Sequence, residues 1–233
     1  MLTRILARET RWLLVGLGLC ALLLVFVSLA GLVMGGDTQT FDTKILRALR
    51  DPADLAKPIG PGWLEGVLLD LTALGGPTVI GLVTVGVTGF FVLQTRYRTA
   101  LVVAVTCFGG EVLDTVMKLL FNRPRPTVVP HLRQAYSTSF PSGHAMESAI
   151  VYLTLAAILM RAVDNRATKL YILGIAVLLT TLVGSSRVYL GVHYPTDVLG
   201  GWVVGFFWAS ICGLAAHQFE GTTHIQAEKQ KST

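Results

Sequence analysis

Long apolar stretches alternate with short polar ones along this chain, which is typical of a protein that crosses a membrane several times. A helix that crosses the hydrocarbon core needs roughly 20 mostly apolar residues. Six stretches come close to this length: 12–34, 75–93, 99–120, 143–160, 169–185 and 197–216. We therefore predict an all-α, polytopic membrane protein with six transmembrane helices, forming a single domain over residues 1–233.

The first stretch has two interpretations, because Arg4, Arg8 and Arg11 precede it as they would in a signal peptide. The apolar core of a signal peptide is only roughly 7–15 residues long. Residues 12–34 exceed this length, and no convincing small-residue cleavage site follows them. We interpret the stretch as a retained first span.

Two polar regions flank the spans. Residues 35–74 are predicted to form an extracytoplasmic segment. Its final part, 63–71, is either a short helix lying along the interface or an early start of the second span. Residues 217–233 read as a frayed polar tail.

Composition strengthens the membrane interpretation. Hydrophobic residues make up 52% of the chain and charged residues 14%, whereas soluble domains carry about 25% charged residues. The net charge of +5 fits basic loops against anionic lipid headgroups, so we predict the bilayer and no nucleic acid as a partner. Cys20, Cys107 and Cys212 all lie in apolar stretches and show neither a disulfide framework nor a paired metal motif.

The charges of the loops predict an orientation. The short loops 94–98 and 161–169 are compact and basic, which favours placing them and both termini in the cytoplasm. The number of spans gives a firmer prediction. Two of the six spans, 143–160 and 169–185, lie between the 121–142 and 186–196 segments, so both segments are on the same side of the membrane.

Three polar clusters fall at that shared face: Lys118–Pro126, Pro141–His144 and Ser186–Asp197. Lys118, Arg125 and Arg187 supply three cations, and guanidinium groups bind phosphate oxygens in bidentate fashion. Ser142 can cap the helix that follows it, leaving the amides of Gly143 and its neighbours free to bind an anion.

Two histidines and an aspartate complete the candidate chemistry. Pro195 suits the first position of the last helix, which places His193 just before that helix and Asp197 in its first turn. The carboxylate could then fix the imidazole tautomer and leave the other ring nitrogen free to attack phosphorus. His144, on a different helix, could protonate the leaving group.

Each of these features, taken alone, also has an ordinary structural explanation. Arginines at a membrane face often anchor headgroups, a histidine at a helix end is usually a satisfied polar residue, and Ser-Gly is commonly a helix cap. Their combination at one face is what indicates an enzyme. No carboxylate-rich cluster suits a hard metal ion, so we predict neither a metal nor a cofactor.

These residues resemble the motifs of the type 2 phosphatidic acid phosphatases (PAP2), which share their site with glucose-6-phosphatases and vanadium haloperoxidases. The family patterns KxxxxxxRP, PSGH and SRxxxxxHxxxD match Lys118–Pro126, Pro141–His144 and Ser186–Asp197 in full.

The resemblance implies a PAP2-like helical core and a phosphohistidine on His193, oriented by Asp197, with His144 as general acid. It also implies that the phosphoryl oxygens are held by five residues: Lys118, Arg125, Ser142, Gly143 and Arg187. The substrate would be a lipid phosphate such as undecaprenyl diphosphate, phosphatidylglycerophosphate or phosphatidate. In similar bacterial enzymes the site faces the periplasm or exterior, so we expect the bacterial cytoplasmic membrane.

Further charged residues lie near these motifs. Asp114 and Glu147 either tune the site or hold helices together through hydrogen bonds, and Glu111 shares a helix face with Lys118. Glu147 is close enough in sequence to reach back to His144. Arg123 could contact a second phosphate or a headgroup, or could lie directly behind the residues of the site and support them.

Four alternative functions stay open at this point. The same phosphohistidine could serve a lipid phosphotransferase, and the same cations a non-catalytic lipid-phosphate transporter. A vanadium haloperoxidase is disfavoured by the six spans, and a zinc or magnesium hydrolase by the missing carboxylate cluster. The sequence does not define an oligomeric state.

Overall fold

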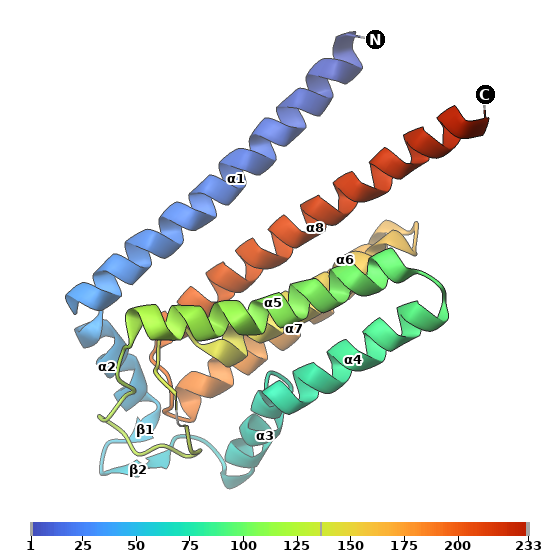
Figure 1. Ribbon diagram of the computed structural model, residues 1–233. Coiled ribbons are helices and arrows are strands. Elements are labelled where there is room, and N and C mark those ends of the chain that lie inside the picture. Colours follow the sequence, from blue (N-terminus) through green and yellow to red (C-terminus); the bar gives the residue numbers. More distant parts are fainter. Residues whose placement is uncertain (1, 136, 232–233) are drawn as a thin grey trace.

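The computed structural model describes residues 2–135 and 137–231 (Figure 1). Within them, eight helices and two short strands follow one another in this order: α1 (Leu2–Gly35), α2 (Gln39–Ala48), β1 (Arg50–Asp51), β2 (Asp54–Pro58), α3 (Gly62–Ala73), α4 (Pro77–Leu93), α5 (Tyr97–Phe121), α6 (Gly143–Arg161), α7 (Arg166–Tyr189) and α8 (Pro195–Lys231).

The membrane spans correspond to the predicted apolar stretches. In the described part of the chain, α1, α5, α6, α7 and α8 are each long and apolar enough to cross a membrane. A sixth candidate span is formed only by α3 and α4 together, which are bent by 43° at a short break, because α4 alone, over the predicted 75–93, is too short. Pro77 begins α4 after this break, where its missing amide costs no helical hydrogen bond. Residues 63–71 thus belong to a separate helix, α3, which packs against α7.

Helix α6 is the centre of the bundle and packs against α5, α7 and α8. Small residues on α8 allow the close approach. A Cβ atom on Gly205 would lie 2.6 Å from the carbonyl oxygen of Met146, so only glycine fits there. Small residues at helix crossings are the usual means of packing inside a membrane, where apolar burial from water gives no driving force between helices. This close packing against α8 holds the first turns of α6 in a fixed position.

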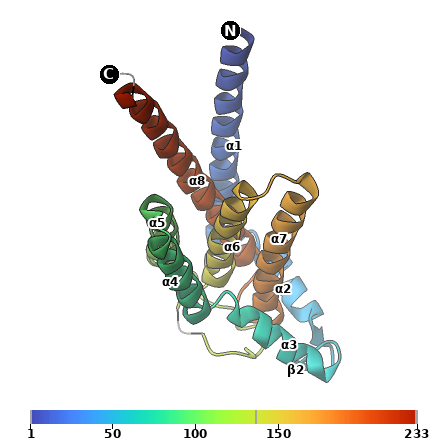
Figure 2. The ribbon, with the colours of Figure 1, turned by 90° about the vertical axis from the view of Figure 1, so that its right-hand side faces the viewer.

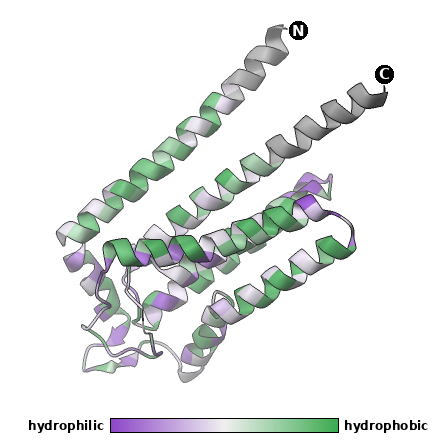
Figure 3. Cartoon of the chain, viewed as in Figure 1, coloured by the Kyte–Doolittle hydropathy of each residue, from purple (hydrophilic) through white to green (hydrophobic). Residues whose placement is uncertain are grey.

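The outer faces of the helices are apolar (Figure 3). Leu13, Leu82, Leu119 and Leu170 are each more than 60% exposed. A water-soluble protein rarely leaves a continuous apolar surface of this extent, so these side chains suit contact with lipid.

The polar elements gather at one end of the bundle (Figures 1 and 2). Helix α2, the β1–β2 ribbon, the 121–142 loop and the turn between α7 and α8 all lie there, while α1 and α8 run away from it. The prediction that the two motif-bearing loops share one face is confirmed, since Arg125 contacts Val192 and His193.

Three features differ from the sequence prediction. Residues 50–58 form an antiparallel ribbon, with Arg50 opposite Pro58 and Asp51 opposite Asp54. Helix α7 extends to Tyr189, beyond the predicted end at 185. Helix α8 continues to Lys231, where a frayed tail was predicted; favourable helix formers such as alanine, glutamate and lysine occur near its end.

Candidate active site

A cavity of about 420 Å³ opens at the polar end of the bundle. It lies between the start of α4, the second half of α5, the first turns of α6 and the 121–142 loop. Six of the eight residues predicted to bind or transfer phosphate line it: Lys118, Arg125, Gly143, His144, Arg187 and His193. Tertiary packing therefore brings all three sequence motifs to one site.

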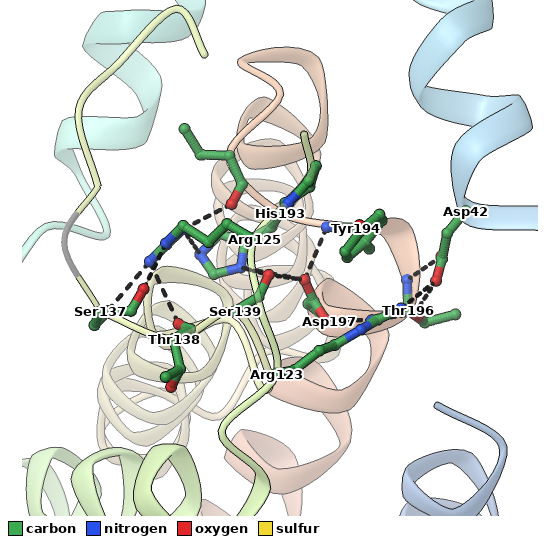
Figure 4. A network of polar contacts seen from close by, with 12 residues as sticks. Asp42, Arg123, Arg125, Ser137, Thr138, Ser139, His193, Tyr194, Thr196 and Asp197 are labelled. Carbon is green, nitrogen blue, oxygen red and sulfur yellow. Dashed lines mark hydrogen bonds and ion pairs between the residues drawn. The ribbon is translucent and has the colours of Figure 1, made fainter. Parts of the chain in front are cut away.

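The hydrogen bonds of His193 define its tautomer (Figure 4). Its Nε2 atom lies 3.1 Å from Nη1 of Arg125. Because a guanidinium can only donate hydrogen bonds, Nε2 must accept and carries no proton. The proton of the neutral ring is therefore on Nδ1, which lies 3.5 Å from Oδ2 of Asp197 and 3.5 Å from Oγ of Ser139. The lone pair of Nε2 is directed toward the cation that would bind phosphate.

Asp197 is completely buried and held by donors on both oxygens. Its Oδ2 atom accepts from the backbone amide of Tyr194 at 2.8 Å and from the hydroxyl of Ser139. Its Oδ1 atom accepts from Nη1 of Arg123 at 2.5 Å. A carboxylate with this many donors has a fixed orientation, so it can hold the imidazole ring of His193 in turn.

Electrostatics keep the imidazole of His193 neutral. Burial lowers the pKa of His193 well below the ordinary histidine value, and the nearby charges of Arg125, Arg187 and Lys118 lower it further. Both effects disfavour the protonated ring. A neutral ring retains its nucleophilic lone pair when the surrounding pH falls below the ordinary histidine pKa.

His144 occupies the first turn of α6 and lines the same cavity. Its Nε2 atom is buried and has no hydrogen-bond partner among the described residues. Buried polar atoms normally have a partner. A ring nitrogen left open inside a cavity is suited to a proton exchange with a bound substrate.

The cations of the cavity are held by different partners. Arg125 donates to the carbonyl oxygens of Ser137 and Val192, each at 2.7 Å. Arg187 donates to the hydroxyl of Thr72 at 3.0 Å, and its Nε atom is unpartnered within the described structure. Lys118 pairs with Asp114 at 2.5 Å.

Gly143 and Ser142 have different surroundings. A Cβ atom on Gly143 would lie 2.8 Å from Nζ of Lys118, so a larger residue there would displace the Lys118 side chain. Ser142 occupies the predicted cap position, but its hydroxyl makes no capping hydrogen bond. Ser142 is fully buried and is not among the residues that line the cavity, and its amide donates to the carbonyl oxygen of Asp197.

The acidic residues lie on the side of the cavity nearer the middle of the bundle. Glu111, Asp114 and Glu147 line it. Glu147 is only 4% exposed, and neither of its oxygens has a hydrogen-bond partner in the described residues. The expected contact from Glu147 back to His144 is therefore absent there, and Asp114 contacts the site through Lys118.

Arg123 does not face the cavity, contrary to the expectation that it contacts a second phosphate. Both of its terminal nitrogens are engaged behind Asp197, and its guanidinium stacks 4.1 Å from the ring centre of Tyr194. The cavity instead receives Arg133 from the 121–142 loop. Sequence reasoning missed Arg133, Ser139 and Asp42. Ser139 lies two residues before the Pro141–His144 motif, whereas the other two have no distinguishing local signal.

Metal ligation finds no support in the described part of the chain, where no three His, Cys, Asp or Glu side chains group closely enough to hold an ion. The polar lining of the cavity consists mainly of cations and histidines, which are suited to an anion.

Comparison with known proteins relates this site to a family. The model of the PAP2 superfamily matches residues 98–219. The chain is 35% identical over 190 residues to phosphatidylglycerophosphatase B of Bacillus subtilis, covering 79% of this chain and 88% of that protein. It is 32% identical over 174 residues to an undecaprenyl-diphosphatase of Sulfolobus acidocaldarius, covering 72% and 76% of the two.

A solved structure shares the fold. The crystal structure of a transmembrane PAP2-type phosphatidylglycerolphosphate phosphatase from Bacillus subtilis superimposes with a TM-score of 0.74 at 31% identity, covering 88% of this chain and 96% of that one.

Proposed function

Because the chain belongs to the PAP2 superfamily, we propose that its cavity is the active site of a lipid phosphatase that works through His193. The protein is an integral membrane enzyme that hydrolyses phosphate esters of lipids. The observation that carries the assignment of residues is the position of His193 in the cavity, with Nε2 at 3.1 Å from Nη1 of Arg125.

The first chemical step transfers the phosphoryl group to His193. Arg125, Arg187 and Lys118 bind the phosphoryl oxygens and neutralise the charge that spreads over them. Nε2 of His193 attacks phosphorus as the bond from phosphorus to the leaving oxygen breaks. Protonated His144 donates its proton to that oxygen, so the alcohol, or the lipid monophosphate formed from a diphosphate, leaves in protonated form.

The second step hydrolyses the phosphohistidine. Neutral His144 takes a proton from a water molecule, whose oxygen attacks phosphorus. The bond between phosphorus and Nε2 breaks, inorganic phosphate leaves, and His144 is protonated again for the next cycle. Asp197 stabilises the positive charge that the imidazole of His193 carries in the intermediate.

The test of this function is phosphate release by purified protein in detergent, with EDTA present. Undecaprenyl diphosphate, phosphatidylglycerophosphate and phosphatidate are offered in parallel. We expect release from at least one lipid, at a rate that the chelator does not change. Loss of activity on chelation would contradict the histidine mechanism. Release that depends on an added lipid acceptor would indicate a phosphotransferase, and the ranking of lipids would define the substrate.

The orientation that we propose places both termini in the cytoplasm and the cavity at the periplasmic or exterior face of the bacterial cytoplasmic membrane. The basic segments 94–98 and 161–169 lie at the end of the bundle opposite the cavity (Figure 1). The preference of positive charge for the cytoplasmic side supports this placement. Labelling of an introduced cysteine in each loop, in intact cells, would test it.

Glu147 is proposed to tune the electrostatics of the cavity. Replacing it with glutamine keeps its size and removes an acid next to the cationic residues. We expect turnover to change by about three- to tenfold, which corresponds to about 1 kcal/mol, with an altered pH profile. The measurement is kcat as a function of pH for Glu147→Gln and wild type. Identical profiles would leave Glu147 a purely structural residue.

A further inference from the structure

A buried ion network lies behind the site, on the side of Asp197 that faces away from the cavity (Figure 4). Arg123 bridges two carboxylates, with Nη1 at 2.5 Å from Oδ1 of Asp197 and Nη2 at 2.9 Å from Oδ2 of Asp42. Both carboxylates are completely buried, and Arg123 is 6% exposed. Buried charges persist in proteins only when they are paired and hydrogen-bonded.

Asp42 is tied to α8 by further contacts. Its Oδ1 accepts from the backbone amide of Thr196 at 3.1 Å, and its Oδ2 accepts from the Thr196 hydroxyl at 2.6 Å. Arg123 also donates to that hydroxyl at 3.0 Å. Helix α2 is thereby attached to the first turn of α8, which carries Asp197.

The position of Asp42 in the chain makes this network unexpected. Asp42 lies in the 35–74 segment, outside residues 98–219 that match the family model and outside the three motifs. Arg123 lies at one of the variable positions of the first motif. Nevertheless, both residues are as deeply buried as the groups that line the cavity.

The network limits how Asp197 can rotate. Arg123 divides its two terminal nitrogens between the two carboxylates and therefore contacts only Oδ1 of Asp197. Oδ2 remains available for Ser139 and for Nδ1 of His193. Without the charge of Asp42, Arg123 would be free to bind Asp197 with both nitrogens, the arrangement that guanidinium and carboxylate groups favour. That rotation would draw Oδ2 away from the imidazole.

We propose that Asp42 is a positioning residue for phosphoryl transfer, which acts through Arg123 to keep the Asp197 carboxylate aligned with His193. This proposal rests on the roles given above to His193 and Asp197. It makes helix α2 part of the catalytic apparatus, although that helix contributes no residue to the lining of the cavity.

The experiment compares Asp42→Asn with wild type in two measurements. The first is the single-turnover rate constant for labelled phosphohistidine, which does not depend on the fraction of folded protein. The second is the inhibition constant of inorganic phosphate, which reports the cations of the cavity. We expect the rate constant to fall by about tenfold to 100-fold, as for small misplacements of catalytic groups, and the inhibition constant to stay unchanged. Asp54→Asn is the matched control on an exposed neighbouring carboxylate.

A double-mutant cycle tests the route of the effect. If Asp42 acts through Arg123, adding Asp42→Asn to Arg123→Gln lowers the rate constant no further than Arg123→Gln alone. Independent effects that multiply would overturn this route. So would a normal rate constant in Asp42→Asn, or a loss of phosphate affinity as large as the loss of rate.

A further variant covers the case in which Asp42→Asn does not fold. Asp42→Glu keeps the charge and displaces it by one methylene group, and the same drop in rate constant with unchanged phosphate inhibition is expected. A normal rate constant in this variant would then count against the proposal. Wild-type protein that forms no phosphohistidine would overturn the proposed function and this proposal with it.

Discussion

Replacing His193 with alanine is expected to lower phosphate release by at least about a thousandfold, because the variant loses the nucleophile of the first step. The cations of the cavity remain, so substrate binding should persist. In the described site, His193 is the histidine whose Nε2 lies beside Arg125, at 3.1 Å from Nη1.

The measurement combines initial rates with an acid-quench experiment. Wild-type protein mixed with lipid labelled in its phosphate should retain label in an acid-labile, base-stable form, as a phosphohistidine does. His193→Ala should retain none. His131→Ala is the matched control, because His131 is exposed and its ring contacts the carbonyl oxygen of Pro126. Normal turnover in His193→Ala would exclude the covalent mechanism, and lost turnover in His131→Ala would show that the assay does not separate the two histidines.

Replacing His144 with glutamine is expected to lower lipid phosphate hydrolysis by about 10²- to 10⁴-fold, the usual contribution of a general acid. An alkoxide leaving group needs a proton as the ester bond breaks, whereas p-nitrophenolate leaves without one. The loss in the first step should therefore be much smaller with p-nitrophenyl phosphate.

A pre-steady-state measurement separates the two roles of His144. With the activated substrate, His144→Gln should release a burst of p-nitrophenol and then turn over slowly, because activation of water in the second step also needs this residue. Wild type serves as the reference for both phases. Equal losses with the lipid and with the activated substrate, and no burst, would indicate that His144 binds phosphate instead of moving a proton.

The spans and the motifs could be predicted from sequence because each depends on local information. A membrane helix satisfies its own backbone hydrogen bonds, so its length and apolarity are visible in the chain. Pro195 begins α8 as predicted, which puts His193 before the helix and Asp197 in its first turn. Because two spans separate their loops, the sequence predicted that Arg125 and His193 lie at the same membrane face, and the two residues are in contact.

Other features depend on which residues meet across the fold. Ser142 sits at the predicted cap, yet its hydroxyl makes no capping hydrogen bond, and its backbone amide donates to the carbonyl oxygen of Asp197 in α8. Arg123 was expected at a second phosphate, but the nearest anions turned out to be two buried carboxylates on separate helices. An arginine in a polar loop shows nothing in sequence of which partner it will find.

Span length and motif spacing are local properties, so the sequence predicts a bundle of membrane helices that carries three motifs at one face. The 43° bend between α3 and α4, the contact of His193 with Arg125 and the attachment of α2 to the first turn of α8 follow from the tertiary structure. Each of these arises from contacts between segments far apart in the chain. Which donor lies nearest to which acceptor is set by packing, and no spacing along the sequence encodes it.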